Sequence, residues 1–272
     1  MNLYDSVSYE LSQRLTERYS TSFSLSSSLL GLSTRPHIYA VYGMVRLADE
    51  IVDTYRGNDA PEELNRFESE VLRAVQVGYS TNPIIQAYAQ TARQFGITDE
   101  LTKPFFDSMR SDLSPTPMDQ AAYEAYIYGS AEVVGLMCLR VFVEGDEAQY
   151  QELRAGAQAL GSAYQKVNFL RDIAADYNEL GRSYFPTITH LDQLTDEAKQ
   201  HIINEVAAEY VTAYDALQNL PKTARRAVRL SYEYYTELLN VLQKAPAETI
   251  KTTRLSVPKF KKTILYLKVR FL

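Results

Sequence analysis

Two pairs of aspartates are notable for their spacing and their neighbours. Asp49 and Asp53 lie four residues apart in RLADEIVD, and Asp172 and Asp176 repeat that spacing in NFLRDIAAD. Residues four apart share one face of a helix. Both pairs are interleaved with apolar residues rather than lysines, which favours carboxylates that face a cavity over a solvated stripe. The sequence therefore predicts a carboxylate pair on each of two helices.

The same spacing also arises by chance, and a third pair shows this. Asp192 and Asp196 straddle an expected loop and helix start, so we assign them to helix capping. A lone pair is weak evidence for a site, because a solvated helix face produces it equally well. The apolar context of the other two pairs is what favours a functional role for them.

Four carboxylates that converge on one region need cations. Two charges about 6 Å apart repel by about 3 kcal/mol at an effective dielectric near 20. Magnesium prefers oxygen ligands, binds one or two carboxylates per ion and fills its other positions with water and phosphate oxygens. Asn168, one turn before Asp172, adds a neutral oxygen. The predicted metal ligands are thus Asp49, Asp53, Asn168, Asp172 and Asp176.

Arginines accompany both aspartate pairs. Arg46 lies one turn before Asp49, and Arg171 adjoins Asp172. Guanidinium groups bind phosphates with two parallel hydrogen bonds. The simpler alternative is that Arg46 only pairs with Glu50, four residues further on. Since the chain contains no P-loop or dinucleotide-type glycine motif, the combination favours a magnesium–diphosphate site outside a nucleotide-binding fold.

The elements that carry these residues are predicted to be helices. The 272 residues include only 11 Gly and 10 Pro, and long stretches lack both. Apolar residues recur at helical spacing, and no stretch alternates as a strand would. We expect an all-α, single-domain bundle over 1–272 around a central cavity. Its predicted helices are 36–56, 61–78, one opening at Asn82-Pro83, 147–180, 195–220 and 221–243, with 123–143 deeply buried.

Composition excludes several classes of protein. The net charge of -6 argues against nucleic-acid binding. The first residues lack the apolar core of a secretory signal, and no run of eighteen apolar residues predicts a membrane span. Cys138 is the only cysteine, so no internal disulfide forms. We expect a cytoplasmic protein, and the sequence predicts no particular oligomeric state.

The C-terminal segment 251–272 is basic, with seven Lys and Arg residues and no acid. Within it, Phe260, Ile264, Leu267 and Phe271 recur at helical spacing among the lysines. Two interpretations stay open. The segment 256–272 lies as a helix on an anionic membrane at the inner face, as a peripheral contact, or it packs on the core with a solvated basic face.

The sequence resembles the squalene/phytoene synthase family over nearly its whole length. The segment LGSAYQKVNFLRDIAADYNELGRSYFP (160–186) carries the family's second signature in full, and VYGMVRLADEIVD (41–53) resembles its first aspartate motif. STSFSLSSSLL (20–30) is similar to the serine–phenylalanine segment, and RLSVPKFKK (254–262) to the C-terminal basic segment. The 160–186 match is highly specific and is the strongest support for the resemblance.

The resemblance implies roles for the residues that match these motifs. The aspartates would hold magnesium, helped by Asn168, and serve catalysis. The diphosphates would be bound by Arg46, Arg171 and Arg254, with Ser20, Ser22 and Tyr42 nearby. Gln165 would line the first substrate site, Phe23 the tunnel wall or the core, and Tyr128 would lie near the reacting carbons. For Tyr42 and Tyr128, a core tyrosine with a satisfied hydroxyl is the alternative.

The family's reaction joins two prenyl diphosphates head to head through a cyclopropyl diphosphate. The resemblance implies phytoene synthesis from two geranylgeranyl diphosphates through prephytoene diphosphate, with two or three magnesium ions or manganese and without NADPH. The same chemistry on farnesyl diphosphate, giving dehydrosqualene or squalene, is one alternative. A non-catalytic assembly or binding protein is another, which the two intact aspartate motifs disfavour.

One segment departs from the family pattern. YIYGSAEVVGLM (126–137) resembles a helix that usually carries a small residue where this chain has Glu132. Glu132 either lies behind that helix or alters the cavity, so it bears on the product rather than on the class of reaction.

Overall fold

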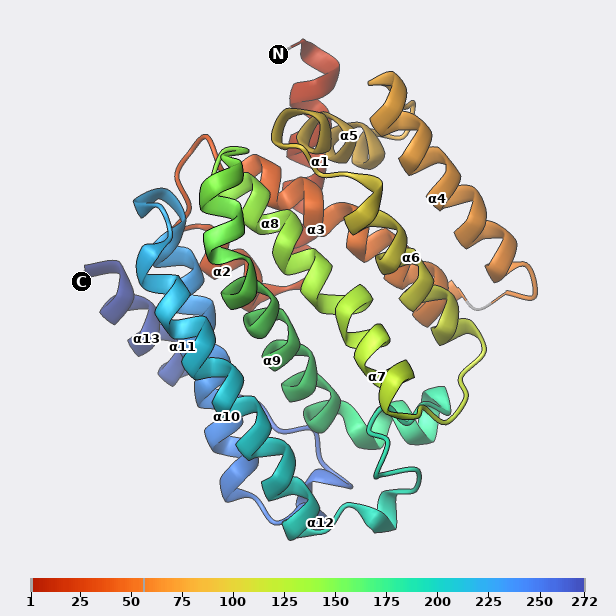
Figure 1. Ribbon diagram of the computed structural model, residues 1–272, viewed down its shortest axis with the longest axis vertical. Coiled ribbons are helices and arrows are strands. Elements are labelled where there is room, and N and C mark those ends of the chain that lie inside the picture. Colours follow the sequence, from red (N-terminus) through yellow and green to blue (C-terminus); the bar gives the residue numbers. More distant parts are fainter. Residues whose placement is uncertain (1, 56, 272) are drawn as a thin grey trace.

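A computed structural model describes residues 2–55 and 57–271, which form helices joined by short connections (Figure 1). No strand occurs within these ranges, so the all-α prediction is confirmed. In chain order the elements are α1 Leu3–Tyr19, α2 Thr21–Ser27, α3 Arg35–Asp49, η1 Glu50–Tyr55, α4 Ala60–Val77, α5 Pro83–Phe95, α6 Asp99–Leu113, α7 Gln120–Ile127, η2 Tyr128–Glu132, α8 Val133–Phe142, α9 Glu147–Leu180, η3 Leu191–Gln193, α10 Asp196–Asn219, α11 Lys222–Lys244, α12 Ala247–Ile250 and α13 Lys259–Phe271.

The long helix α9 runs through the middle of the bundle, between α8 and α10 (Figure 1). Its 34 residues extend over about 51 Å. Leu153, near its start, belongs to a core shared with α3, α5, α6 and α8. Val167 and Leu170, further along, belong to a second core shared with α7, α10 and α11. One helix therefore contributes to both apolar cores.

Glycines allow neighbours to approach α9 closely. A Cβ at Gly156 would lie 2.1 Å from the Cβ of Ala216 on α10, and one at Gly161 would lie 2.7 Å from the carbonyl oxygen of Ala131 in η2. Both distances are far below van der Waals contact, so any larger residue would push α10 or η2 away from α9.

The boundaries predicted for α9 and α10 are confirmed, because strong capping residues set them. Asp146 accepts a hydrogen bond from the Gln149 amide at 3.0 Å to begin α9, and Gly181 ends it at a φ of +66°. Thr195 accepts from the Ala198 amide at 3.1 Å to begin α10. Side-chain caps and a left-handed glycine are signals that the sequence states directly.

One predicted helix and one stretch predicted to be buried each contain a π-helical turn. The helix expected over 36–56 is α3 followed by the π turn η1, and its predicted end at 56 lies outside the described residues. The apolar stretch 123–143 divides into α7, the π turn η2 and α8. Such turns often occur at functional sites, and residue periodicity does not reveal them.

One stretch, Gln120–Phe142, is long and apolar enough to cross a membrane by length and composition. This differs from the expectation of no such span, which counted only uninterrupted apolar runs. In the structure the stretch packs against α6 and α9. Its residues Val133, Leu136 and Met137 are fully buried, as expected for a helix inside the bundle.

Candidate active site

The first aspartate pair lies at the junction of α3 and η1. Asp49 is the last residue of α3, and Asp53 follows in the π turn. Burial and the negative charge of Asp53 raise the pKa of Asp49 from 3.8 to about 7. Arg46 forms an ion pair with Glu50, and its Nη1 lies 3.7 Å from Asp49 Oδ2. The pairing with Glu50 weighed above is therefore present, but it leaves Arg46 beside the aspartates.

The second pair lies on the C-terminal half of α9. Arg171 Nε donates to Asp172 Oδ1 at 2.9 Å, and Arg254 Nε donates to the same oxygen at 2.6 Å. Burial acts to raise the pKa of Asp172, but the hydrogen bonds from the two arginines outweigh it and lower that pKa. Burial and the charge of Asp172 raise the pKa of Asp176 to about 7. Two arginines thus hold Asp172 in its ionised form, whereas burial favours the protonated form of Asp176.

Arg182 connects the two pairs. It follows α9 directly, and its Nη1 donates to Asp53 Oδ1 at 2.7 Å. Its Nη2 donates to the carbonyl oxygens of Val52 and Asp112 at 3.2 Å each. The charge of Asp53 also contributes to the raised pKa of Asp176. The structure therefore brings the two acidic turns to face each other.

Asp112, at the end of α6, is a member of this site that sequence reasoning missed. Its carboxylate accepts hydrogen bonds from Tyr126 at 2.7 Å and Tyr184 at 3.1 Å. Burial raises its pKa to about 6, although the nearby Arg182 charge acts to lower it. Asp112 stands alone in the sequence, without an aspartate four residues away. Its partner Tyr184 lies in the 160–186 signature, but that signature does not identify which acid it contacts.

Lys262 was not singled out in the sequence either. Its Nζ donates to Ser22 Oγ at 2.8 Å, which links the start of α13 to α2. Burial and the positive charge of Arg171 lower its pKa. In the described part of the chain no carboxylate pairs with Lys262. A lysine held beside an arginine without an acid between them is typical of an anion-binding site.

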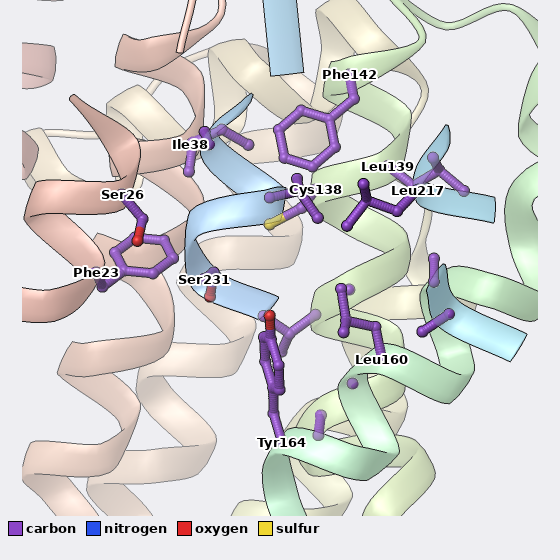
Figure 2. A pocket seen from close by; sticks show the side chains of 18 of the residues that line it. Phe23, Ser26, Ile38, Cys138, Leu139, Phe142, Leu160, Tyr164, Leu217 and Ser231 are labelled. Atoms are coloured by element: carbon purple, nitrogen blue, oxygen red, sulfur yellow. The ribbon is translucent and has the colours of Figure 1, made fainter. Parts of the chain in front are cut away.

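A cavity of about 360 Å³ begins next to these charged groups and runs between α2, α3, α8, α9, α10 and α11 (Figure 2). Asn168, one turn before Asp172, lines it near the charged groups, and Leu153 lines it at the other end of α9. The two residues are 15 positions apart, which corresponds to about 22 Å of helix. Much of the wall is small: Ser26, Ser27, Ala131, Gly135, Gly156, Ala157, Gly161, Ala213, Ala216 and Ala227. A long, flexible apolar chain is the ligand that such a cavity accommodates.

Aromatic rings line the end of the cavity that is nearest the charges. Phe23 stacks on Tyr42 with centroids 4.9 Å apart, and Tyr164 stacks on Tyr235 at 3.9 Å. The Tyr235 hydroxyl donates to Asn168 Oδ1 at 3.2 Å. Figure 2 shows the Tyr164 hydroxyl pointing into the cavity. The faces of these rings carry partial negative charge, which stabilises a cation enclosed between them.

Ser20, Gln165 and Tyr128, the other predicted site residues, and Glu132 each lie in a different environment. Ser20 caps α2 by accepting from the Phe23 amide at 3.2 Å. Gln165 Nε2 donates to Ser130 Oγ at 3.1 Å, which fixes it against η2. Tyr128 packs beside the first core and does not line the cavity, so its role stays a prediction. Glu132 accepts from Gln158 Nε2 at 2.8 Å and lies outside the cavity wall, behind the helix.

The donor set suits magnesium without forming a complete cage. Among the residues described, no group of three or more His, Cys, Asp or Glu side chains is arranged to hold a metal ion. Magnesium, however, needs only one or two carboxylates when water and phosphate oxygens supply its other ligands. Burial, together with neighbouring carboxylates, raises the pKa of Asp49 and of Asp176 to about 7, so a cation bound beside them would favour their ionised forms.

A helical bundle with an apolar cavity that opens onto facing aspartate pairs has the architecture of the isoprenoid synthases. This chain belongs to the squalene/phytoene synthase family, whose model matches residues 16–261. The resemblance seen in the sequence is thereby confirmed.

Three similar proteins illustrate the range of the family. A phytoene synthase from Arthrospira platensis is 30% identical over 192 residues, 66% of this chain and 62% of that protein. A 4,4'-diapophytoene synthase from Staphylococcus haemolyticus is 23% identical, over 95% of this chain and 94% of its own length. The crystal structure of a dehydrosqualene synthase in complex with ligand superimposes with a TM-score of 0.84 at 22% identity, covering 98% of this chain and 96% of that one. This last similarity shows the fold alone.

Proposed function

We propose that this protein is a prenyltransferase that condenses two geranylgeranyl diphosphates head to head to give phytoene, through prephytoene diphosphate, for carotenoid biosynthesis. The observation that carries the proposal is the junction of two facing aspartate pairs and four cationic side chains with an apolar cavity. The cationic groups are Arg46, Arg171, Arg254 and Lys262. The name of the phytoene synthase from Arthrospira platensis supports this product, whereas the relative from Staphylococcus haemolyticus is named a 4,4'-diapophytoene synthase.

The length of the cavity favours the C20 substrate over the C15 one. An extended C20 prenyl chain needs about 20 Å and a C15 chain about 15 Å, on ordinary bond lengths. The α9 wall from Asn168 to Leu153 is about 22 Å long. A C15 chain would leave the end near Leu153 and Phe142 empty, without the contacts that stabilise a well-filled cavity.

The side chains divide the work of the reaction. Arg171, Arg254 and Lys262 bind the diphosphate oxygens and hold the leaving group after its C–O bond breaks. The apolar walls exclude water that would quench the allylic cation, and the stacked aromatic pairs stabilise its charge.

Magnesium is the proposed metal, with manganese as a substitute. Asp49, Asp53, Asp172 and Asp176, with Asn168, would hold it. When bound, it would supply Lewis-acid stabilisation of the departing diphosphate, an effect of several kcal/mol. Arg182 would keep Asp53 in place for this purpose, since it already donates to that carboxylate. We do not expect NADPH to be consumed, because phytoene forms by loss of a proton rather than by reduction.

Incubation with labelled prenyl diphosphates tests the proposed function. Geranylgeranyl and farnesyl diphosphate are supplied separately, each with and without NADPH, and the products are separated by chain length. We expect a C40 product from the C20 substrate, in equal amount with and without NADPH. A C30 product as the main outcome would refute the substrate assignment, and no condensation of either substrate would refute the enzyme assignment.

Ala157→Phe should reverse the preference for chain length. Ala157 lines the cavity on α9, three turns from Asn168, so a phenyl ring there would block the far third while leaving room for a C15 chain. We expect the ratio of kcat/KM for the C20 to the C15 substrate to fall at least about tenfold. Glu132→Ala is the matched control, because Glu132 lies behind the wall. An unchanged ratio in Ala157→Phe would contradict this account of the cavity.

The stabilisation by Mg²⁺ should increase with pH. Because burial raises the pKa of Asp49 and of Asp176 from 3.8 to about 7, the folded metal-free protein binds more protons than the unfolded chain between about pH 4 and pH 7. Its free energy of unfolding therefore falls as pH rises through that window. Mg²⁺ competes with those protons, so the gain in Tm should be larger at about pH 8 than at about pH 5.5. Thermal scans with and without Mg²⁺ at both pH values measure this gain in Tm. The same scans on Asp176→Asn, which lacks one of the two carboxyl groups, show how much that group contributes. Equal gains at both pH values would count against the metal assignment.

We also propose the cytoplasm as the site of action, in keeping with a single unpaired Cys138.

A further inference from the structure

One face of α13 packs on the bundle. Val269 is buried against Leu230 and Tyr234 of α11, and Leu265 packs in the same cluster together with Leu25 of α2. The Tyr234 hydroxyl donates to the carbonyl oxygen of Lys262 at 3.0 Å. The helix is therefore fixed on α2 and α11, as the second interpretation of the C-terminal segment required.

The other face of α13 exposes a row of large apolar side chains. Phe260 is 68% exposed, Ile264 58%, Leu267 47% and Phe271 78%. They are spaced by four, three and four residues, so they form one stripe along the helix. These are the residues whose spacing was noted in the sequence, and in the described chain they belong to no apolar cluster. A contiguous exposed apolar row of this kind marks an interaction surface.

The charge around the stripe indicates what it contacts. Every charged residue of α13 is basic, namely Lys259, Lys261, Lys262, Lys268 and Arg270. Lys261 and Lys268 contact Glu237 and Glu233 of α11, and Lys262 faces Ser22. Lys259 and Arg270 remain at the two ends of the stripe. An apolar row between cations is the pattern of a helix that lies in the interface of an anionic bilayer.

We propose that α13 docks this protein on an anionic lipid bilayer, with Phe260, Ile264, Leu267 and Phe271 inserted below the headgroups and Lys259 and Arg270 on the phosphates. The two helices beneath α13 form part of the cavity wall, through Phe23 and Ser27 of α2 and Ser231 and Tyr235 of α11. The docked face is thus one helix layer from the apolar cavity. This inference goes beyond the proposed function and does not depend on which prenyl diphosphate is used.

A second exposed stripe in the same molecule provides an internal control. On α1, Leu3, Val7 and Leu11 are 82%, 39% and 43% exposed. They too recur every four residues, but Asp5 and Glu10 accompany them. If apolar exposure alone caused membrane binding, both stripes would contribute. If the combination with cations is required, only α13 binds anionic lipid.

The test is sedimentation of the full-length protein with vesicles, without substrate and without Mg²⁺. Vesicles of phosphatidylcholine alone are compared with vesicles containing phosphatidylglycerol, at low and high salt. We expect the variant Phe260→Ser/Ile264→Ser/Leu267→Ser/Phe271→Ser to bind the anionic vesicles at least about tenfold more weakly than the wild type. Lys259→Glu/Arg270→Glu should weaken binding and reduce its salt dependence. Leu3→Ser/Val7→Ser/Leu11→Ser should bind as the wild type does.

Each outcome decides the proposal. Thermal unfolding shows that the variants are folded, and turnover in detergent shows that loss of binding is separate from loss of chemistry. Wild-type binding by the α13 variant, or equal loss in the α1 variant, overturns the proposal. The proposal is also overturned if the stripe holds two copies of the protein together. In that case the α13 variant would differ from the wild type in elution volume but not in vesicle binding. A protein that docks but condenses no prenyl diphosphate would refute only the proposed function.

Discussion

Asp53→Asn and Asp172→Asn should each lower kcat at least about a thousandfold, which corresponds to about 4 kcal/mol of transition-state stabilisation. Each change keeps the shape of the side chain and removes one negative charge. Asp53→Asn also weakens the charge-assisted hydrogen bond from Arg182, and Asp172→Asn does the same for the bonds from Arg171 and Arg254. The proposed metal loses a ligand in both variants, while the folded structure should persist.

Steady-state turnover with labelled geranylgeranyl diphosphate measures this effect. Asp192→Asn is the matched control, because Asp192 belongs to the third aspartate pair of the sequence and is exposed, and Thr195 rather than Asp192 caps α10. It should retain full turnover. If both site variants turned over normally, the carboxylates would have no part in the chemistry. If both lost turnover and also unfolded, thermal scans would show it, and Asp176→Asn would then be the variant of choice.

Arg182→Met should destabilise the protein by about 3–5 kcal/mol, the usual cost of removing one partner from a buried charge pair. Arg182 is only 5% exposed and Asp112 only 8%. Without the guanidinium, Asp112 keeps its two tyrosine donors but loses its neutralising charge, and the carbonyl oxygens of Val52 and Asp112 lose a donor. Urea unfolding at neutral pH gives the free energy directly.

Two further measurements identify the cause of that loss. The double variant Arg182→Met/Asp112→Asn should recover part of the lost stability, because the unpaired charge is gone. Arg182→Met should also be less destabilised near pH 5 than near pH 7.5, because Asp112, whose pKa is raised to about 6 by burial, is then protonated. If the double variant is no more stable than the single one, the loss comes from packing rather than from charge.

The sequence predicted those parts of the site that lie within one helix. The four-residue spacing placed Asp172 and Asp176 on one face of α9, and Gly181 was predicted to end that helix, as it does. The contacts of Asp112 with Tyr126 and Tyr184 join residues 14 and 72 positions apart, and no local pattern records such contacts. The π turns η1 and η2 were missed for the same reason, since they depend on what packs around them.

The C-terminal helix shows a different limit of sequence reasoning. The periodicity of Phe260, Ile264, Leu267 and Phe271 was visible, and two interpretations of it were left open. The structure shows that α13 has a second apolar face, Leu265, Tyr266 and Val269, which makes the packing contact. Two apolar faces on one helix cannot be assigned to core or surface from spacing alone, because the assignment depends on where α2 and α11 lie.

The acidic residues of α9 and its cavity-lining residues lie in different parts of the same helix. Its C-terminal half holds Asp172 and Asp176, while Leu153, Ala157 and Leu160 form the wall of the cavity further back. Mutations at the two ends are far enough apart to act additively. Single substitutions at Leu153, Ala157 or Leu160 should therefore change the space inside the cavity without moving Asp172 or Asp176.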